Sequence, residues 1–359
     1  MKTVLHVVGA RPNFMKVAPI HRAIARRGKL AQRLVHTGQH YDRAMSEVFF
    51  RELGLPAPDV HLGVGSGTHA EQTAKVLVAM ERVIEQERPA IVSVVGDVNS
   101  TLAAALAAAK LRVPLAHVEA GLRSFDRDMP EELNRLVVDA LADHLLTPSP
   151  DADENLRREG IPDSRIHLVG NVMIDSLMAA LPAARALGMP QRLGLEPGRF
   201  AVCTLHRPAN VDDPACLGRI LDGLARVAQR VPILFPVHPR TRGRLAALGF
   251  EGSERVRLTE PLGYLELLSL TASSALILTD SGGLQEEATV LGVPCLTLRE
   301  NTERPITIVE GTNALVGSDP ERIEAAADRA LGGYVRGRVP ALWDGATGER
   351  IAELYERLA

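Results

Sequence analysis

Residues 275–288 read ALILTDSGGLQEEA and decide the fold class. An apolar, strand-forming run stops at Asp280, two glycines allow a sharp turn, and a helix-forming sequence begins. Such a turn places unpaired N–H groups and the positive end of a helix dipole at the carboxyl end of a strand. The stretch therefore predicts a phosphate-binding turn in a parallel α/β sheet.

Length and charge limit the classes of protein to consider. The chain has 359 residues, of which 46% are hydrophobic and 24% charged, which suits two globular α/β domains. Its net charge of −3 argues against nucleic acid as a partner, so any anion site must be local. No apolar run approaches the ~18 residues of a membrane span, and the N-terminus does not resemble a signal peptide. We therefore expect a cytoplasmic enzyme with no membrane partner.

Short apolar runs alternate with helical patterns in both halves, which is typical of parallel sheets wound with helices. We expect two Rossmann-like parallel-sheet domains that face each other across a central cleft. The predicted domains are residues 1–168 and 169–346, and the striped helix 347–359 is expected to pack back on the first. The predicted strands are 3–8, 33–37, 90–95, 115–118, 144–147, 200–205, 233–236, 256–258, 275–279 and 295–298, and the clearest helices are 100–110 and 130–142.

Polar residues follow the predicted strands of the first half. The segment GARPNFMK from Gly9 is neither a dinucleotide fingerprint nor a P-loop, but it places Arg11 and Lys16 at a strand end. Phosphate binding is favoured there over a loop with two solvated cations. Asp97 ends another strand, where a helix cap and a catalytic acid are equally good interpretations. Glu119 is poorly suited to the end of a buried strand unless it has a partner.

Two further glutamates stand in the first turn of the predicted helix that begins at Pro130. The helix dipole favours anions in that turn, so it accounts for one of Glu131 and Glu132. Asp97, Glu119 and Glu131 could nonetheless converge on one crevice, as acid–base catalysis requires. Carboxylates that lie close together raise each other's pKa values, which helps one of them act as an acid.

The second half repeats the pattern with cations. His206 and Arg207 follow one predicted strand, and His238 and Arg240 follow the next. Metal binding is a poor interpretation because the histidines lack close ligand spacing, and contact with a diphosphate is better. The charged segment RENTERP from Arg299 follows the last strand and could equally be a solvated loop.

Together these motifs make the chain resemble the non-hydrolysing UDP-N-acetylglucosamine 2-epimerases, a family with the two-domain GT-B fold. The resemblance rests on GARPNFMK, TGQHYD, GDVNST, HVEAGLRS, MPEELNR, HRPANVD, PVHPR, TDSGGLQEEA and RENTERP, which occur in this order. It implies reversible epimerisation of UDP-GlcNAc to UDP-ManNAc, through elimination of UDP to a 2-acetamidoglucal and re-addition. It also implies that no metal or other cofactor takes part, that the enzyme is a homodimer, and that its product serves cell-surface polysaccharide biosynthesis.

The resemblance also implies roles for individual residues. Asp97, Glu119 and Glu131 would move the C2 proton, and His206 would assist the departure of UDP. The implied UDP or substrate contacts are Arg11, Lys16, Arg135, His238, Ser281, Gly282, Gly283, Glu287 and Arg304. A second, activating UDP-GlcNAc binds some bacterial members at positions that correspond to Gln39, His40, Gln72 and Arg207. The segment HRPANVDD departs from the HRREN-like segment of many such members, which argues against activation here.

Three alternatives share part of this reasoning. A GT-B glycosyltransferase has the same fold and UDP site, and a hydrolysing epimerase shares the first step but releases ManNAc and UDP. A nucleotide-sugar sensor would need no set of three carboxylates. The carboxylates favour an epimerase, and the fate of the glucal separates its two types.

Overall fold

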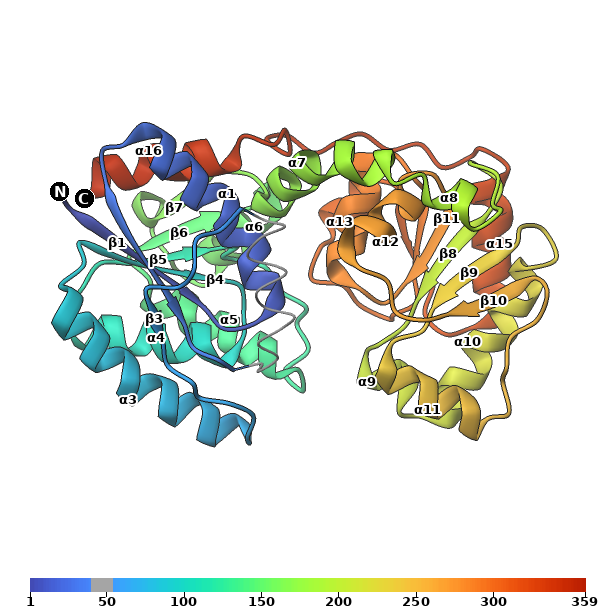
Figure 1. Ribbon diagram of the computed structural model, residues 1–359, viewed down its shortest axis with the longest axis horizontal. Coiled ribbons are helices and arrows are strands. Elements are labelled where there is room, and N and C mark those ends of the chain that lie inside the picture. Colours follow the sequence, from blue (N-terminus) through green and yellow to red (C-terminus); the bar gives the residue numbers. More distant parts are fainter. Residues whose placement is uncertain (40–53) are drawn as a thin grey trace. The chain divides into compact units, whose positions relative to one another are not determined.

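The computed structural model describes residues 1–39 and 54–359, without the side chain of Arg11. The described residues form two compact units (Figure 1). The first unit contains Met1–Ser176 and Ala341–Ala359, and the second contains Leu177–Pro340. The chain therefore leaves the first unit and later returns to it for its last helix.

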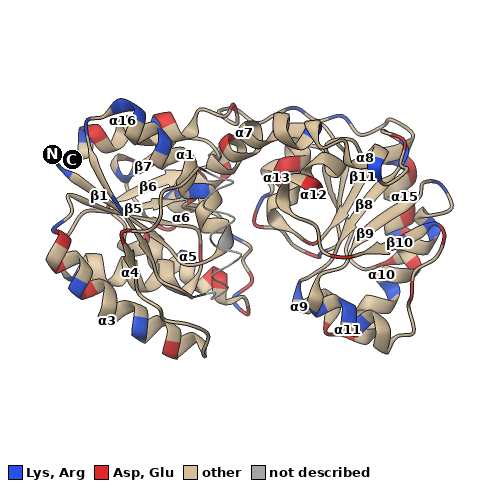
Figure 2. Cartoon of the chain, viewed as in Figure 1, with Lys and Arg blue, Asp and Glu red and all other residues tan. Residues whose placement is uncertain are grey.

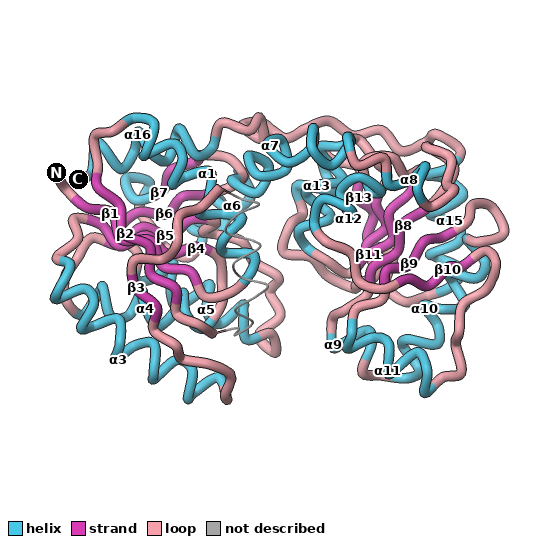
Figure 3. The backbone as a smooth tube through the Cα atoms, in the orientation of Figure 1, coloured by secondary structure: helices cyan, strands magenta, loops and turns pink. Residues whose placement is uncertain are grey.

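Within the described residues the first unit has a seven-stranded parallel sheet in the order β3-β2-β1-β4-β5-β6-β7. Its elements are β1 (Thr3–Val8), α1 (Arg11–Arg27), β2 (Ala31–His36), β3 (Val60–His61), α3 (His69–Glu87), β4 (Ile91–Val95), α4 (Asn99–Lys110), β5 (Leu115–Val118), α5 (Pro130–Leu141), β6 (His144–Thr147), α6 (Pro150–Arg158), η1 (Asp163–Arg165), β7 (Ile166–Leu168), α7 (Val172–Ala186, which crosses into the second unit) and α16 (Thr347–Leu358). Helices lie on both faces of the sheet (Figure 3). Every residue of the central strands β4 and β5 is buried for this reason.

The last helix completes one face of the first unit. α16 packs against α1, and Ile351, Leu354 and Tyr355 join the apolar cluster between these helices and the sheet. The hydroxyl groups of Tyr355 and Ser93 lie 2.8 Å apart, which ties α16 to β4 at the centre of the sheet. Of the helices in the described part of the chain, none combines the length and apolar character that crossing a membrane would need.

The second unit has a six-stranded parallel sheet among its described residues, in the order β10-β9-β8-β11-β12-β13. Its elements are α8 (Met189–Arg192), β8 (Ala201–Thr204), α9 (Pro208–Val211), α10 (Pro214–Val227), β9 (Ile233–Pro236), α11 (Pro239–Ala247), β10 (Val256–Thr259), α12 (Tyr264–Thr271), β11 (Leu276–Thr279), α13 (Gly282–Leu291), β12 (Cys295–Thr297), α14 (Ile306–Val309), β13 (Asn313–Leu315) and α15 (Pro320–Leu331). The turn that opened the sequence argument is the β11–α13 connection.

Each sheet has one point at which the strand order reverses. The reversal lies between β1 and β4 in the first unit and between β8 and β11 in the second. Ligands of open α/β sheets bind outside the carboxyl ends of the strands at such a switch point. Most of the polar motifs of the sequence follow these strands and their neighbours.

The predicted parallel α/β fold is confirmed in both units, but the prediction omits three strands. These are β3, β7 and β13, and each is an edge strand of two or three residues. An edge strand pairs on one side only and stays partly exposed, so it shows no apolar run in the sequence.

Candidate active site

One side chain ties the turn after β1 to the end of β4. Asn13 Oδ1 accepts hydrogen bonds from the backbone N–H groups of Gly9 (3.1 Å) and Ala10 (3.0 Å). Its Nδ2 donates to the carbonyl of Val95 (3.0 Å). The two strand ends at the switch point of the first unit are therefore held together. Arg11 begins α1 directly after this turn, and its side chain is outside the described part of the structure.

Glu119 follows β5 in an unusual backbone conformation. Its φ of 71° lies in the left-handed region, which residues other than glycine rarely adopt. Lys16 Nζ donates to its carboxylate, and both side chains are buried. Gly96 leaves room for this pair, because a Cβ atom there would lie 2.9 Å from Lys16 Nζ. Lys16 is thus the partner that a glutamate at a buried strand end needs, and strained backbone of this kind clusters at functional sites.

Asp97, after β4, is accessible although its partner is buried. Its side chain is 28% exposed, whereas that of Arg135, which donates to Oδ2, is 4% exposed. Asn134 Nδ2 donates to the Asp97 backbone carbonyl (2.7 Å). The second carboxylate oxygen of Asp97, Oδ1, forms no hydrogen bond to the described residues. The carboxylate is therefore oriented by one charged group and leaves one oxygen available.

Glu131 and Glu132 differ completely in environment. Glu132 is buried and accepts hydrogen bonds from the backbone N–H groups of Ser124 (3.0 Å) and Phe125 (2.9 Å). Burial would raise the pKa of Glu132, but hydrogen bonds from Ser124 and Arg135 lower it overall. Glu131 is exposed and forms no hydrogen bond or ion pair with the other described residues. Glu132 therefore shapes the loop before α5, and Glu131 is the accessible carboxylate of the two.

In the second unit, Asp280 orients the loop after β8. It is fully buried, and its Oδ2 accepts hydrogen bonds from the backbone N–H groups of His206 (3.0 Å) and Arg207 (2.9 Å). Its Oδ1 lies 2.9 Å from His206 Nδ1, and the histidine side chain is 44% exposed. Burial works to raise the pKa of Asp280, but hydrogen bonds from His206 and Arg207 lower it overall. The carboxylate thus fixes the direction of an accessible imidazole.

Glu303 holds three arginines beside this loop. Arg207 Nη2 lies 3.2 Å from Oε1, Arg299 Nη2 lies 2.9 Å from Oε2, and Arg304 Nη1 also donates to Oε1. Burial opposes ionisation of Glu303, but the three guanidinium groups hold its pKa far below the usual range. Arg304 approaches the start of α13 closely, because a Cβ atom at Gly282 would lie 2.5 Å from its Nη1.

The β11–α13 turn combines backbone donors with a buried acid. The N–H group of Ser281 donates to Thr279 Oγ1 (3.0 Å), and Gly282 and Gly283 form the first turn of α13. One turn further, Glu287 is buried and accepts a hydrogen bond from the Tyr264 hydroxyl (3.0 Å). Burial raises the pKa of Glu287 to about 7, although the bond from Tyr264 acts in the opposite direction.

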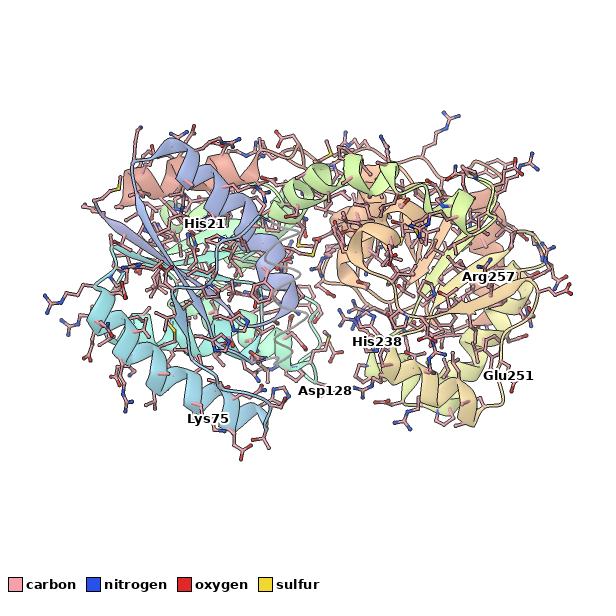
Figure 4. All side chains as sticks on the ribbon, in the orientation of Figure 1. His21, Lys75, Asp128, His238, Glu251 and Arg257 are labelled. Atoms are coloured by element: carbon pink, nitrogen blue, oxygen red, sulfur yellow. The ribbon has the colours of Figure 1, made fainter. Side chains whose placement is uncertain are left out.

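His238 caps the N-terminus of α11, and Figure 4 labels it there. Its Nδ1 accepts a hydrogen bond from the backbone N–H group of Arg240 (3.2 Å), and its ring centre lies 6.1 Å from that of His206. Burial, together with His206 and Arg240, lowers the pKa of His238. Arginines are frequent along α11 (Figure 2), and Arg240 and Arg244 form ion pairs with Asp212.

Two of the residues predicted for a second nucleotide-sugar site, Gln39 and Gln72, lie in contact in the first unit, where Gln72 Nε2 donates to the Gln39 backbone carbonyl (3.5 Å). Gln39 Oε1 accepts hydrogen bonds from the N–H group (3.0 Å) and hydroxyl (2.6 Å) of Ser100, in the first turn of α4. Gln72 Oε1 accepts a hydrogen bond from Asn99 Nδ2 (2.9 Å), the residue before Ser100. Arg207 belongs to the Glu303 cluster of the second unit, and His40 lies outside the described residues.

Asp280, Glu303 and Tyr264 are members of the site that are not predicted from the sequence. Asp280 carries a detectable signal, since it is the polar residue at which the apolar run of β11 stops. Glu303 stands among charges of both signs, and the sequence does not show which of them is buried. Tyr264 gives no signal, because it comes from a different helix and meets Glu287 only in the folded unit.

Comparisons with known proteins show which family and which structures the chain is similar to. Residues 22–356 match the family model described as UDP-N-acetylglucosamine 2-epimerase. The chain is 42% identical over 358 residues to the UDP-N-acetylglucosamine 2-epimerase of Methanocaldococcus jannaschii, with 97% of each chain covered. It is 43% identical over 359 residues to the UDP-2,3-diacetamido-2,3-dideoxy-D-glucuronate 2-epimerase of Pseudomonas aeruginosa, with 99% of each covered. The crystal structure of the M. jannaschii enzyme in complex with UDP-GlcNAc and UDP is similar with a TM-score of 0.90 and 41% identity, over 99% of each chain.

Proposed function

The chain belongs to the UDP-N-acetylglucosamine 2-epimerase family, and we propose that it interconverts UDP-GlcNAc and UDP-ManNAc by inverting C2 of the sugar. The observation that carries the proposal is the pair of oriented carboxylates at the switch point of the first unit. Arg135 orients Asp97, and Lys16 holds Glu119. Proton transfer at a sugar carbon needs acids and bases held in this way.

Elimination and re-addition make inversion at C2 chemically accessible. The C2 hydrogen is not α to a carbonyl, so its direct removal would leave an unstabilised carbanion. When UDP leaves C1 with its bonding electrons and a base takes the C2 proton, a C1=C2 double bond forms in a 2-acetamidoglucal. UDP then returns to C1 and a proton returns to the opposite face of C2. The two steps balance without an oxidant or reductant.

The first unit supplies the acid–base groups of this reaction. Asp97, Glu119 and Glu131 remove and return the C2 proton, and the accessible positions of Asp97 and Glu131 suit that work. Lys16, in contact with Glu119, adds a positive charge where negative charge develops on the departing diphosphate. Arg11 has the same proposed role.

The second unit supplies the UDP contacts. The first N–H groups of α13, at Gly282 and Gly283, suit phosphate, since they lie at the positive end of the helix. Ser281 is the N-cap residue beside them, and its hydroxyl is its proposed contact with the phosphate. His206 can donate a proton or a hydrogen bond to the leaving diphosphate, and Arg304 adds charge. His238 and Glu287 complete the proposed contacts of this unit, with Glu287 accepting from a ribose hydroxyl. Arg135, in α5 of the first unit, is a further proposed contact.

An exposed apolar face on the first unit supports the proposal that the chain forms a homodimer. On α5, Leu133 and Val137 are 41% and 45% exposed and stand four residues apart, so they share one helix face. Large apolar side chains that share an exposed face are typical of protein interfaces. We expect this face of α5 to pack against a second copy of the chain.

Proton NMR of the purified protein with UDP-GlcNAc in deuterium oxide tests the reaction. We expect deuterium at C2 together with the appearance of UDP-ManNAc, because the proton is exchanged during elimination and re-addition. Free ManNAc and UDP would identify a hydrolysing enzyme instead. An unchanged spectrum would contradict the proposal for this substrate.

A second candidate substrate follows from the Pseudomonas relative. That protein is named for UDP-2,3-diacetamido-2,3-dideoxy-D-glucuronate and is as similar to this chain as the archaeal epimerase is. The same elimination applies to that sugar, since the reacting C1 and C2 are unchanged. The value of kcat/KM for each sugar, measured side by side, decides between them.

A further inference from the structure

A buried polar network lies behind the two carboxylates of the first unit. Its central member is Asp139, in the third turn of α5, whose side chain is buried together with those of His117 and Arg123. None of these three side chains belongs to the acid–base set above. Burial of three charged or titratable groups is costly unless they are paired, so the network needs a reason.

Asp139 contacts the chain on both sides of Glu119. Its Oδ1 lies 2.6 Å from His117 Nδ1, two residues before Glu119. Its Oδ2 accepts a hydrogen bond from the N–H group of Gly121 (3.0 Å), two residues after Glu119. The same oxygen forms an ion pair with Arg123 Nη1 (2.7 Å). The turn between these contacts contains the left-handed conformation of Glu119. Such a conformation persists only where its surroundings fix it.

His117 links Asp139 to the turn that contains Asp97. Its Nε2 lies 2.9 Å from the carbonyl oxygen of Gly96, the residue before Asp97. Both ring nitrogens therefore lie against oxygen atoms, one of the Asp139 carboxylate and one of the backbone just before Asp97. Burial would raise the pKa of Asp139, but His117 and Arg123 lower it overall, which keeps the central carboxylate ionised.

We infer that Asp139, acting through His117, is a positioning residue that fixes the Asp97 turn and the Glu119 turn relative to each other. This inference rests on the proposed function, in which both carboxylates act on one carbon. A misplacement of about 1 Å can cost 10²-fold in rate, so a shared clamp for two reacting groups has a large effect.

Asp139→Asn is the first test, because it keeps the size of the side chain and removes its charge. We expect kcat to fall by about 10²-fold, with the dissociation constant of UDP changed by less than about twofold. The deuterium isotope effect on kcat with C2-deuterated UDP-GlcNAc should rise, since proton transfer becomes slower relative to the other steps.

Asp175→Asn is the matched control. Asp175 is also a buried carboxylate of the first unit that accepts hydrogen bonds from two backbone N–H groups, those of Thr347 (3.1 Å) and Gly348 (2.7 Å). It anchors α16 and contacts neither turn. We expect this variant to unfold at a lower temperature but to keep the wild-type kcat and isotope effect. Equal losses of kcat in the two variants would mean that Asp139 only stabilises the fold.

Two substitutions of His117 separate its two contacts. The amide nitrogen of Asn occupies roughly the place of Nδ1, and that of Gln the place of Nε2. His117→Asn should therefore preserve slow amide hydrogen exchange at Glu119–Gly121 and accelerate it at Gly96–Asp97. His117→Gln should do the reverse, and Asp139→Asn should accelerate exchange at Glu119–Gly121 most.

Hydrogen exchange also separates this inference from the proposed function. If the wild-type protein turned over no UDP-sugar, the function would be refuted while exchange at the two turns still tested the clamp. If exchange at both turns were the same in wild type, Asp139→Asn and both His117 variants, the clamp would be refuted even in an active enzyme.

Discussion

The two switch points arrange charge in opposite ways. In the first unit the acid is accessible and its partner is hidden: Asp97 is 28% exposed and Arg135 4%. In the second unit the acid is hidden and its partner is accessible: Asp280 is fully buried and His206 is 44% exposed. The same fold thus offers an accessible carboxylate at one sheet and an accessible imidazole at the other, which suits the acid–base and anion-binding roles proposed for them. Which member of an ion pair is accessible indicates what the pair does.

The largest expected effect concerns the three carboxylates proposed to move the C2 proton. We expect Asp97→Asn, Glu119→Gln and Glu131→Gln each to lower kcat by about 10³-fold, because general acid–base catalysis is lost. UDP binding, measured by calorimetry, should remain, since the proposed UDP contacts are mainly in the second unit. Glu85→Gln, at an exposed position of α3, is the control. Near wild-type turnover in all three variants would refute the assignment of acid–base work to the first unit.

Glu287 tests whether an acid hidden in the second unit can be neutral. Burial raises its pKa from 4.5 to about 7, so the folded protein holds the proton more tightly than the unfolded chain. Its contribution to stability is therefore fully present below pH 4.5 and is lost as the pH rises through about 7. The expected loss is about 3 kcal/mol in the free energy of unfolding.

Urea unfolding of wild type and Glu287→Gln between pH 4.5 and 8 measures this loss. The Gln side chain still accepts the hydrogen bond from Tyr264 but does not titrate, so the variant should lack this part of the pH dependence. The same pH dependence in both proteins would show that Glu287 is ionised throughout.

A double-mutant cycle of Asp280 and His206 tests whether the buried acid acts through the accessible histidine. We expect Asp280→Asn to lower kcat by about 10²-fold, because His206 loses the carboxylate that orients it. His206→Ala should impair elimination more than UDP binding. In the double variant the second substitution should add little, since both remove one function. Fully additive losses would mean that Asp280 acts independently of the histidine.

The smallest expected effect is at the start of α13. In Gly282→Ala the new methyl group would lie 2.5 Å from Arg304 Nη1 and 2.9 Å from Glu303 Oε1, so the ends of both side chains must move. The helix N-terminus itself remains. We therefore expect the dissociation constant of UDP to rise only about threefold, with folding unchanged. An increase of 10²-fold or more would show that Arg304 and not the helix provides most of the binding.

Much of the fold can be predicted from sequence because parallel strands are buried on both faces. Strands such as β1, β5 and β9 are mostly apolar and almost wholly buried, and the predicted bounds agree with the observed ones. The edge strands β3 and β13 were missed, since their burial is partial and their pairing partners lie far away in the sequence.

The site is less predictable because burial is decided by tertiary contacts. Glu131 and Glu132 are neighbours on a helix with the same local preference, but only Glu132 meets the loop at Ser124. Asp139 lies nine residues into α5 and resembles an ordinary helical acid until the fold brings it to His117. The ends of strands can be predicted from the sequence, whereas side-chain contacts between different helices, strands and loops are known only from the structure.

The return of the chain to the first unit has a consequence for biosynthesis. All of Leu177–Pro340 leaves the ribosome before Ile351, Leu354 and Tyr355 are made, so the second unit has its complete sequence first. The first unit, although translated earlier, must wait with one apolar face of α1 uncovered until α16 arrives. During synthesis that waiting surface is the part of the molecule most in need of a chaperone.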